Sequence, residues 1–377
     1  MNWQTAIEVA TVLACVRVIA NGMSQVPFRV FQDQGNGKSV AVDHPLYDLI
    51  YRRPNAWQSS YEFRETLTFH TALTGNAFVW KGMVGSDRTI RTLEPIEPRM
   101  MTVERAADQT LTYKVTADDG ATVTFAADEI WHIRGPSWNS WMGLDATKMA
   151  RDAIGLSIAI ETTQADSAKH GAKVSGLLST DGVLSADKFE FLSKWLDKHA
   201  TGGERADKPL ILDNGAKFTP LQMTGVDAQH LETRKHQIEE ICRAFGVMPI
   251  MVGHADKTAT YASAEQMFLA HVVHTLSPWY ERIEQSADTQ LLTAQERADG
   301  YYTKFTPNAL MRGAAKDRGE FYAKALGAGG APAWMKPNEV RALEELDALP
   351  DGDVLYGPSN AAPPGEPPDE PPDEEAA

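Results

Sequence analysis

Cysteine is scarce in this sequence, which limits the kinds of protein it can encode. Two cysteines occur in 377 residues, Cys15 and Cys242, and they lie far apart on apolar, helix-like patterns. A disulfide scaffold or a thiolate metal site needs several cysteines at characteristic spacings. We therefore interpret both side chains as buried hydrophobic residues.

A long uninterrupted hydrophobic run is also missing. The apolar stretch 6–23 is broken by Glu8 and Arg17, and no basic segment precedes it. A membrane span needs about 20 apolar residues, and a signal peptide needs a basic start. The sequence predicts neither, so we expect a soluble protein that is made in the cytoplasm.

Basic residues are fewer than acidic ones. The chain has 36 Lys and Arg against 51 Asp and Glu, a formal net charge of -15, whereas a protein that grips phosphates along an extended surface needs the opposite sign. Residues 361–377 hold six acidic and no basic side chains among prolines, so this tail is predicted to be disordered. Without those six charges the remainder still carries -9, and tight nucleic-acid binding is disfavoured.

The apolar residues alternate between helical and strand-like spacing, which predicts an α+β fold in more than one domain. Ser59 or Ser60, followed by Glu62, is a helix start, Gly22 is a helix stop, and Pro278 should kink a long helix. The predicted helices are 5–23, 59–73, 145–169, 185–199, 227–245, 264–292, 316–326 and 336–346. The predicted strands are 28–31, 39–42, 77–80, 111–115, 122–125, 176–178, 210–212 and 301–305.

Three short patterns have a chemical interpretation and a simpler structural one. The segment 35–39 (GNGKS) is an incomplete phosphate-binding loop and fits a hairpin turn better. Ser185 and Lys188 have the spacing of an acyl enzyme, but Ser185 fits as a helix cap. His271 and His274, one to two turns after Glu265, are too few to specify a metal site. We therefore predict no catalytic residue, no metal and no cofactor.

Several segments, in order along nearly the whole chain, resemble the portal (head-to-tail connector) proteins of tailed bacteriophages, in the form found with long-tailed phages and gene transfer agents. Asp145 and Ala146 replace the usual Ser-Pro after Gly143 and Leu144, and Met248 with Pro249 replaces two prolines, so these differences concern loop shape. The segments are 13–20 (LACVRVIA), 26–28 (VPF), 44–47 (HPLY), 53–55 (RPN), 62–63 (EF), 74–78 (TGNAF), 128–135 (DEIWHIRG), 143–144 (GL), 227–253 and 337–343 (PNEVRAL).

The resemblance implies a portal fold with wing, helical stem, small α/β clip, long kinked helix and helical C-terminal crown. The family usually has residues ahead of its first helix, and here Met1 almost directly precedes it, so a naturally short and a trimmed N-terminus both stay open. The implied parts are a wing at 1–143, a stem helix at 144–170, a clip at 171–226, a second stem helix at 227–246, a loop projecting into a channel at 247–263, a wing helix and strand at 264–310, a crown at 311–360 and a tail at 361–377.

The resemblance also implies a function: a ring, usually of twelve subunits, at one capsid vertex, through which double-stranded DNA is packaged and ejected. The implied partners are other subunits, double-stranded DNA without sequence specificity, the large terminase, a head-tail adaptor, and the major capsid and scaffold proteins. The implied location is the virion, and the host cytoplasm during assembly. The candidate residues are His254, Asp256, Lys257, Thr258 and Tyr261 in the channel loop; Glu232, Arg234, Lys235, Glu239, Glu240 and Arg243 on the stem; and Lys188, Glu190, Lys194, Asp197 and Lys198 in the clip.

Two other hypotheses stay open on the sequence alone. A portal-derived adaptor would share the fold but form no large ring. An enzyme acting on nucleic acid or the cell wall would need a pocket with clustered carboxylates or histidines, and no such cluster is visible in the sequence.

Overall fold

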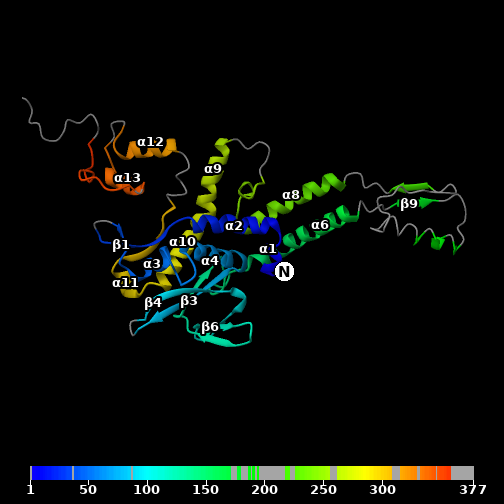
Figure 1. Ribbon diagram of the computed structural model, residues 1–377, viewed down its shortest axis with the longest axis horizontal. Coiled ribbons are helices and arrows are strands. Elements are labelled where there is room, and N and C mark those ends of the chain that lie inside the picture. The colour runs from blue at the N-terminus through cyan, green and yellow to red at the C-terminus, as the bar shows by residue number, and fades with distance from the viewer. Residues whose placement is uncertain are drawn as a thin grey trace, which may run out of the picture. The chain divides into compact units, whose positions relative to one another are not determined.

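The computed structural model (Figure 1) divides into two compact units, Met1–Phe305 and Thr306–Ala377, and each is described by itself. Helices and antiparallel sheets occur in separate segments, so the fold class is α+β, as predicted. The structure describes residues 2–35, 38–85, 88–170, 176–179, 186–187, 189–191, 193–194, 217–220, 226–254, 261–307, 315–328, 332–344 and 346–357.

Two helices begin the first unit, α1 (Trp3–Ile7) and α2 (Ala10–Ser24), where one continuous helix was predicted. The helix stop predicted at Gly22 is wrong, because α2 continues to Ser24 with Gly22 buried inside it. A Cβ at Gly22 would lie 2.6 Å from a methyl carbon of Leu276. This glycine therefore serves close packing between α2 and a later helix, and not termination.

A three-stranded antiparallel sheet joins the two ends of this unit. Its strand order is β11-β1-β2, from β1 (Phe28–Asp33), β2 (Lys38–Val40) and β11 (Tyr301–Phe305). Phe28 pairs with Phe305, and their rings stack with centroids 4.3 Å apart. The segment 35–39 thus follows β1 and enters β2, as the hairpin interpretation predicted, although residues 36 and 37 lie outside the description.

Two helices follow, α3 (Pro45–Tyr51) and α4 (Ser60–Thr74). The predicted start of α4 is confirmed, since Ser59 and Glu62 form a capping box. The short helix α3 was not predicted; Pro45 occupies its first turn and His44 caps it by accepting from Leu46 N. Helix α4 packs along α2, and its core positions face away from solvent.

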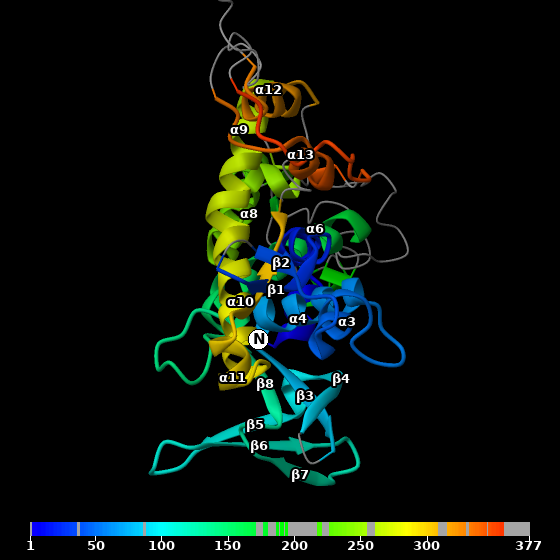
Figure 2. The same ribbon diagram turned by 90° about the vertical axis from the view of Figure 1, so that its left-hand side faces the viewer.

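The region 76–134 forms two small antiparallel sheets, confirming its predicted β character. One has the order β4-β3-β8 and the other β5-β6-β7, and Phe78, Tyr113 and Ile130 form a shared buried cluster. Figure 2 shows them at the lower end of the view. The strands are β3 (Asn76–Val84), β4 (Thr89–Ile96), β5 (Met101–Arg105), β6 (Leu111–Thr116), β7 (Thr122–Phe125) and β8 (Ile130–Arg134), with a 3-10 turn, η1, at Pro98–Met100.

The long helix predicted at 145–169 is present as α5 (Ala146–Met149) and α6 (Arg151–His170), and α8 (Val226–Phe245) matches the helix predicted at 227–245. Between α6 and α8, the strand predicted at 176–178 is β9 (Gly176–Ser179). Its antiparallel partner is β10 (Lys217–Pro220), which was not predicted, because the proline that ends it argues against a strand. The strand predicted at 210–212 lies outside the described residues.

The helix predicted around Pro278 consists of α9 (Tyr261–His271), a π-helical turn η3 (Val272–Leu276) and α10 (Ser277–Gln290). Proline lacks an N–H, so an unbroken helix would lose one backbone bond here. The chain instead widens by one residue, with Ser277 N donating to the carbonyl of Val272. The predicted interruption is therefore real and takes the form of a π-turn.

The remaining elements complete the two units. In the first, α11 (Ala294–Ala298) leads into β11, the strand predicted at 301–305. In the second, α12 (Ala315–Ala325) and α13 (Pro337–Leu343) confirm the last two predicted helices. Asn338, on α13, is bonded to Leu349 and to Asp353, which fixes the segment after the helix. The acidic tail lies outside the described residues.

Candidate functional site

Two long helices, α6 and α8, lie side by side and run in opposite directions (Figure 1). Arg234 on α8 joins them: its Nη1 donates to Gln164 Oε1 at 3.0 Å, and its Nη2 lies 3.6 Å from Glu161 Oε1. All three side chains are exposed or partly exposed, and exposed ion pairs contribute at most about 1 kcal/mol. The contact fixes the register of the two helices more than it stabilises them.

The C-terminal end of α8 is anchored in the body of the first unit. Cys242 is fully buried, and its Sγ lies 3.7 Å from Sγ of Cys15 on α2. After the helix ends, the Gly246 carbonyl accepts from the hydroxyl of Thr275 at 2.8 Å. The predicted apolar stripe is confirmed for Ile241, Cys242 and Phe245, while Ile238 is half-buried and the side chain of Leu231 lies outside the description.

The six candidate residues on the stem lie off that buried stripe. Arg243 is ion-paired with Glu240, and His236 lies 3.8 Å from the same carboxylate. Helices α6 and α8 together carry seven acidic and five basic residues, so their charge is nearly balanced. Glu232, Arg234, Lys235, Glu239 and Arg243 are exposed, and Glu240 is half-buried.

The loop predicted at 247–263 is shorter than expected. It contains a 3-10 turn, η2 (Pro249–Val252), and the backbone N–H of His254 donates to the Pro249 carbonyl at 3.0 Å. Placing Tyr261 in this loop was wrong, because α9 begins at that residue; the strong helix former Ala262 lets the helix extend back past Ser263. The candidates Asp256, Lys257 and Thr258 lie outside the described residues.

Only part of the candidate clip surface is described. Glu190 and Lys194 are both exposed and form an ion pair of 2.7 Å at the i,i+4 spacing of a helix. Lys188, Asp197 and Lys198 lie outside the described residues, as does the cap predicted at Ser185.

Three segments of the resemblance, the first of them distant in sequence from the other two, meet at one junction of glycines. Gly75 ends α4 with a φ of 76°, and its carbonyl accepts from Gly135 N at 2.7 Å. A Cβ on Gly143 would collide with that same carbonyl. The three backbones approach so closely that only glycine fits at Gly143. This junction closes the segment 135–144 onto the end of α4.

A buried hydrogen-bond chain supports the glycine junction. His132 Nε2 lies 3.0 Å from Asn76 Oδ1, and the ring's Nδ1 lies 3.2 Å from the hydroxyl of Tyr113. Asn76 Oδ1 also accepts from Gly143 N at 2.8 Å. Burial lowers the pKa of His132 to about 3, so this imidazole is neutral and each nitrogen has a partner. Sequence separation hid this chain; Asn76, His132 and Gly143 lie within resembling segments, whereas Tyr113 does not.

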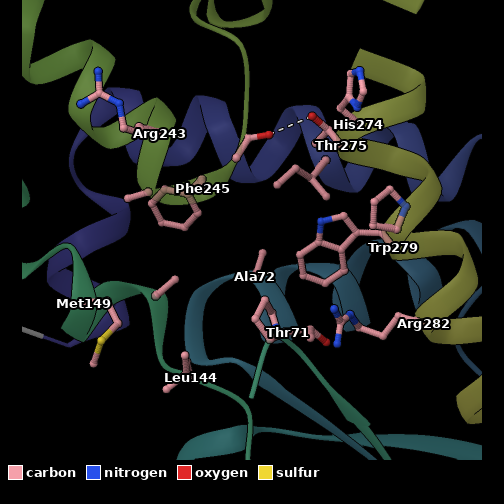
Figure 3. A pocket seen from close by; sticks show the side chains of 16 residues that line it. Thr71, Ala72, Leu144, Met149, Arg243, Phe245, His274, Thr275, Trp279 and Arg282 are labelled. Carbon is pink, nitrogen blue, oxygen red and sulfur yellow. Dashed lines mark hydrogen bonds between the residues drawn. The ribbon is translucent and has the colours of Figure 1, made fainter. Parts of the chain in front are cut away.

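Beside the junction lies an open groove with a volume of about 380 Å³ (Figure 3). Arg243 and Phe245 of α8 form one wall, and Trp279 and Arg282 of α10 form the other. Leu144 closes one end, next to the glycine junction. The remaining lining includes Thr71, Ala72, Met149, His274 and Thr275.

One positive charge in this groove, that of Arg282, is not neutralised within the described part of the chain, whereas Arg243 is paired with Glu240. Arg282 Nη1 donates to the Arg134 carbonyl at 3.2 Å, and Arg134 Nε donates to the Trp141 carbonyl at 3.1 Å. Neither guanidinium forms an ion pair with a described carboxylate. Burial lowers the pKa of Arg282.

The other chemical candidates remain isolated. His271 is buried, its Nδ1 has no described partner and burial lowers its pKa, whereas His274 is exposed. Among the described residues, no three His, Cys, Asp or Glu side chains are grouped to hold a metal. Within the same residues, no helix combines the length and the apolar character that crossing a membrane requires.

Comparison with known proteins agrees with the resemblance seen in the sequence. The family model described as "Phage portal protein" matches residues 10–345. The portal protein of Enterobacteria phage HK97 is 28% identical over 366 residues, covering 96% of this chain and 84% of that protein. The probable portal protein of Streptomyces phage phiC31 is 28% identical over 361 residues, covering 92% and 76%.

Solved structures lead to the same family. A chain from the neck of an empty gene transfer agent particle, computed with C6 symmetry, is 25% identical with a TM-score of 0.62, covering 89% of this chain and 90% of that one. Since the family model covers most of its length, the chain belongs to the phage portal protein family.

Proposed function

We propose that this chain is the subunit of a portal ring that occupies one vertex of a capsid and conducts double-stranded DNA during packaging and ejection. The observation that carries the proposal is the family match over residues 10–345. A twelve-membered ring is proposed, and the C6 symmetry of a similar gene transfer agent neck is compatible with that number. The paired helices α6 and α8, anchored at one end in an α+β body, supply a wall that a ring can repeat.

We assign the parts expected from the resemblance to elements of the structure. The wing is assigned to α1–β8 together with the interrupted helix α9, η3 and α10 and with β11, the stem to α6 and α8, and the clip to the segment that carries β9 and β10. The loop before α9 is assigned to the channel, and α12 and α13 to the crown.

Charge supports a channel through which DNA slides. Ring symmetry repeats every wall charge around the axis, and DNA carries one negative charge per roughly 1.7 Å of helix axis. Walls with seven acidic and five basic residues per subunit give a duplex no net attraction. DNA contacts are therefore weak and independent of sequence.

The proposed role is structural and not enzymatic. Energy for DNA movement comes from a separate ATPase, the large terminase, which docks on the clip together with a head-tail adaptor at a later stage. The major capsid and scaffold proteins are the other proposed partners. The subunit assembles in the host cytoplasm and remains in the virion.

Solution mass combined with negative-stain images tests this function. A ring of about twelve subunits with a central hole wide enough for a duplex, about 20 Å, is the expected result. A persistent monomer at every protein concentration would contradict the ring and favour a portal-derived adaptor. A double variant, Glu232→Lys with Glu239→Lys, should retain DNA at low salt, whereas the matched Lys235→Glu should not.

A further inference from the structure

We infer that the groove between α8 and α10, together with the loop that carries Trp138, is the face on which the next copy of this chain seats. The segment that seats there is the neighbour's edge around Trp57 and Glu94. This inference rests on the proposed function, because it names the contact that closes the ring.

The first half of the contact is a rigid loop with an exposed aromatic tip. Trp138 is 91% exposed, and hydrogen bonds within the loop hold the backbone around it. Asn139 Oδ1 accepts from Trp141 N and Met142 N at 3.2 and 2.9 Å, and Leu144 N donates to the Pro136 carbonyl at 2.7 Å. A fixed, solvent-exposed tryptophan gains more from docking than a mobile one, because little entropy is lost.

The second half is built in the same way from a different part of the chain. Trp57 is 67% exposed, at the end of the segment that joins α3 to α4. Buried Asn55 holds this segment by accepting from Trp57 N at 3.1 Å and from Gln58 N at 2.8 Å. The indole N–H of Trp57 donates to Glu94 Oε2 at 3.2 Å, so an aromatic ring and a carboxylate lie together.

The two loops project to opposite sides of the first unit. In Figure 2 the segment between β8 and α5 extends to the left and the segment between α3 and α4 extends to the right. A closed ring is built from heterologous contacts, in which one face of a subunit meets a different face of the next. Exposed aromatic anchors on opposite sides satisfy that requirement, whereas two anchors on one side would favour a dimer.

Charge favours the same pairing. The groove next to the Trp138 loop contains Arg282, whose described partner is a carbonyl oxygen and not a carboxylate. The opposite edge offers the carboxylate of Glu94. Arg52 on that edge is already paired with Asp48 at 3.6 Å, and Arg53 donates to the Ala56 carbonyl. In a chain with a formal net charge of -15, a neighbour's carboxylate is the available counter-ion.

Cysteine cross-linking of the full-length protein tests the contact. Ala56→Cys and Ser140→Cys, at exposed positions beside the two tryptophans, are combined in one chain that keeps both rings, and the chain is treated with a short bis-maleimide under conditions in which rings are counted by negative stain. The native cysteines are buried and should stay unmodified. The double variant should give a ladder of covalent oligomers, because each subunit offers both halves. Either single variant should remain monomeric on a denaturing gel.

Val123→Cys combined with Ser140→Cys is the matched control and should give no ladder, since Val123 is 53% exposed on β7, in a different sheet from the strand that carries Glu94. Rings without a ladder from the double variant would overturn this contact and leave the proposed function standing. Dimers from a single variant would also overturn it, by showing an isologous contact. Absence of both rings and ladder would overturn the contact and the ring together.

Trp57→Ala and Trp138→Ala should each reduce the ring fraction at least tenfold without changing the melting temperature.

Discussion

Sγ of Cys15 lies 3.7 Å from Sγ of Cys242, although 227 positions separate the two residues in sequence. Both side chains are fully buried, and both are free thiols. The contact connects α2, at the start of the chain, to the anchored end of α8. The pair therefore packs the C-terminal end of α8 against α2 in the body of the first unit.

The first prediction concerns the reactivity of these thiols. The hydrogen bond to Cys242, together with burial, raises the pKa of the Cys15 thiol, whereas the same contact lowers the pKa of Cys242. Both side chains are fully buried, so both cysteines should resist a thiol reagent such as DTNB in the native protein because the reagent cannot reach them. Both should react rapidly in urea. Absorbance during the reaction measures the rates, and Val123→Cys supplies an exposed comparison that reacts without denaturant. Rapid native labelling of Cys242 would show that α8 is not anchored as described.

The second prediction compares two glycines. Gly143→Ala should lower the melting temperature severely or prevent folding, because the new Cβ collides with the Gly75 carbonyl and neither backbone can move freely. Gly155→Ala is the matched control in α6, where a Cβ meets nothing within 4 Å. Since alanine is a better helix former by up to about 1 kcal/mol, the control should be neutral or stabilising. Equal changes in melting temperature from the two variants would contradict the claim that the close approach at Gly143 requires glycine.

Local signals predicted most helices and several strands correctly. The capping box at Ser59 and Glu62 located the start of α4, and the alternating pattern located β11. Local signals failed where tertiary contact decides the outcome. Glycine is a common residue just after the end of a helix, yet Gly22 lies inside α2, where Leu276 packs closely against it.

For the candidate site, the sequence predicted which positions of α8 are exposed, but not which distant residues meet. The sequence identified the polar positions of α8 because they alternate with its apolar stripe, and the described positions lie off the buried face. It did not reveal the groove beside Phe245, whose walls come from helices more than 30 residues apart. Nor did it reveal the link between His132 and Asn76, since hydrogen bonds between distant segments leave no periodic pattern.

The third prediction concerns the link between α6 and α8. Arg234→Ala should lower the free energy of unfolding by less than about 1 kcal/mol, because Arg234 and Glu161 are about half exposed and water screens their charges. The effect should shrink further in high salt. Urea denaturation at two salt concentrations measures it, with Arg151→Ala as a control for loss of an exposed arginine outside this link. A salt-independent loss of several kcal/mol would mean that the contact is buried by another subunit.

The fourth prediction concerns acid stability. Burial lowers the pKa of His70 to about 4 and that of His132 to about 3, against about 6.5 in the unfolded chain. The unfolded state therefore binds protons first as the pH falls. The free energy of unfolding should therefore decline as the pH falls below about 6.5. The contribution of these two histidines to the decline should end near pH 3 to 4. Desolvation raises the pKa values of the buried Glu284 and the partly buried Asp288, and these carboxyls act in the opposite direction.

A variant separates the histidine contribution from that of the carboxyls. His70 Nδ1 is buried without a described partner in an apolar groove, so His70→Leu should be neutral or stabilising at pH 7.5. Between pH 6.5 and 4 the variant should gain up to about 3 kcal/mol relative to the native protein, because the carboxyls are common to both and cancel. Melting temperatures across this range measure the difference, and His236→Leu, at an exposed site on α8, controls for loss of a histidine. Parallel pH profiles for His70→Leu and the native protein would show that His70 is not held neutral by burial.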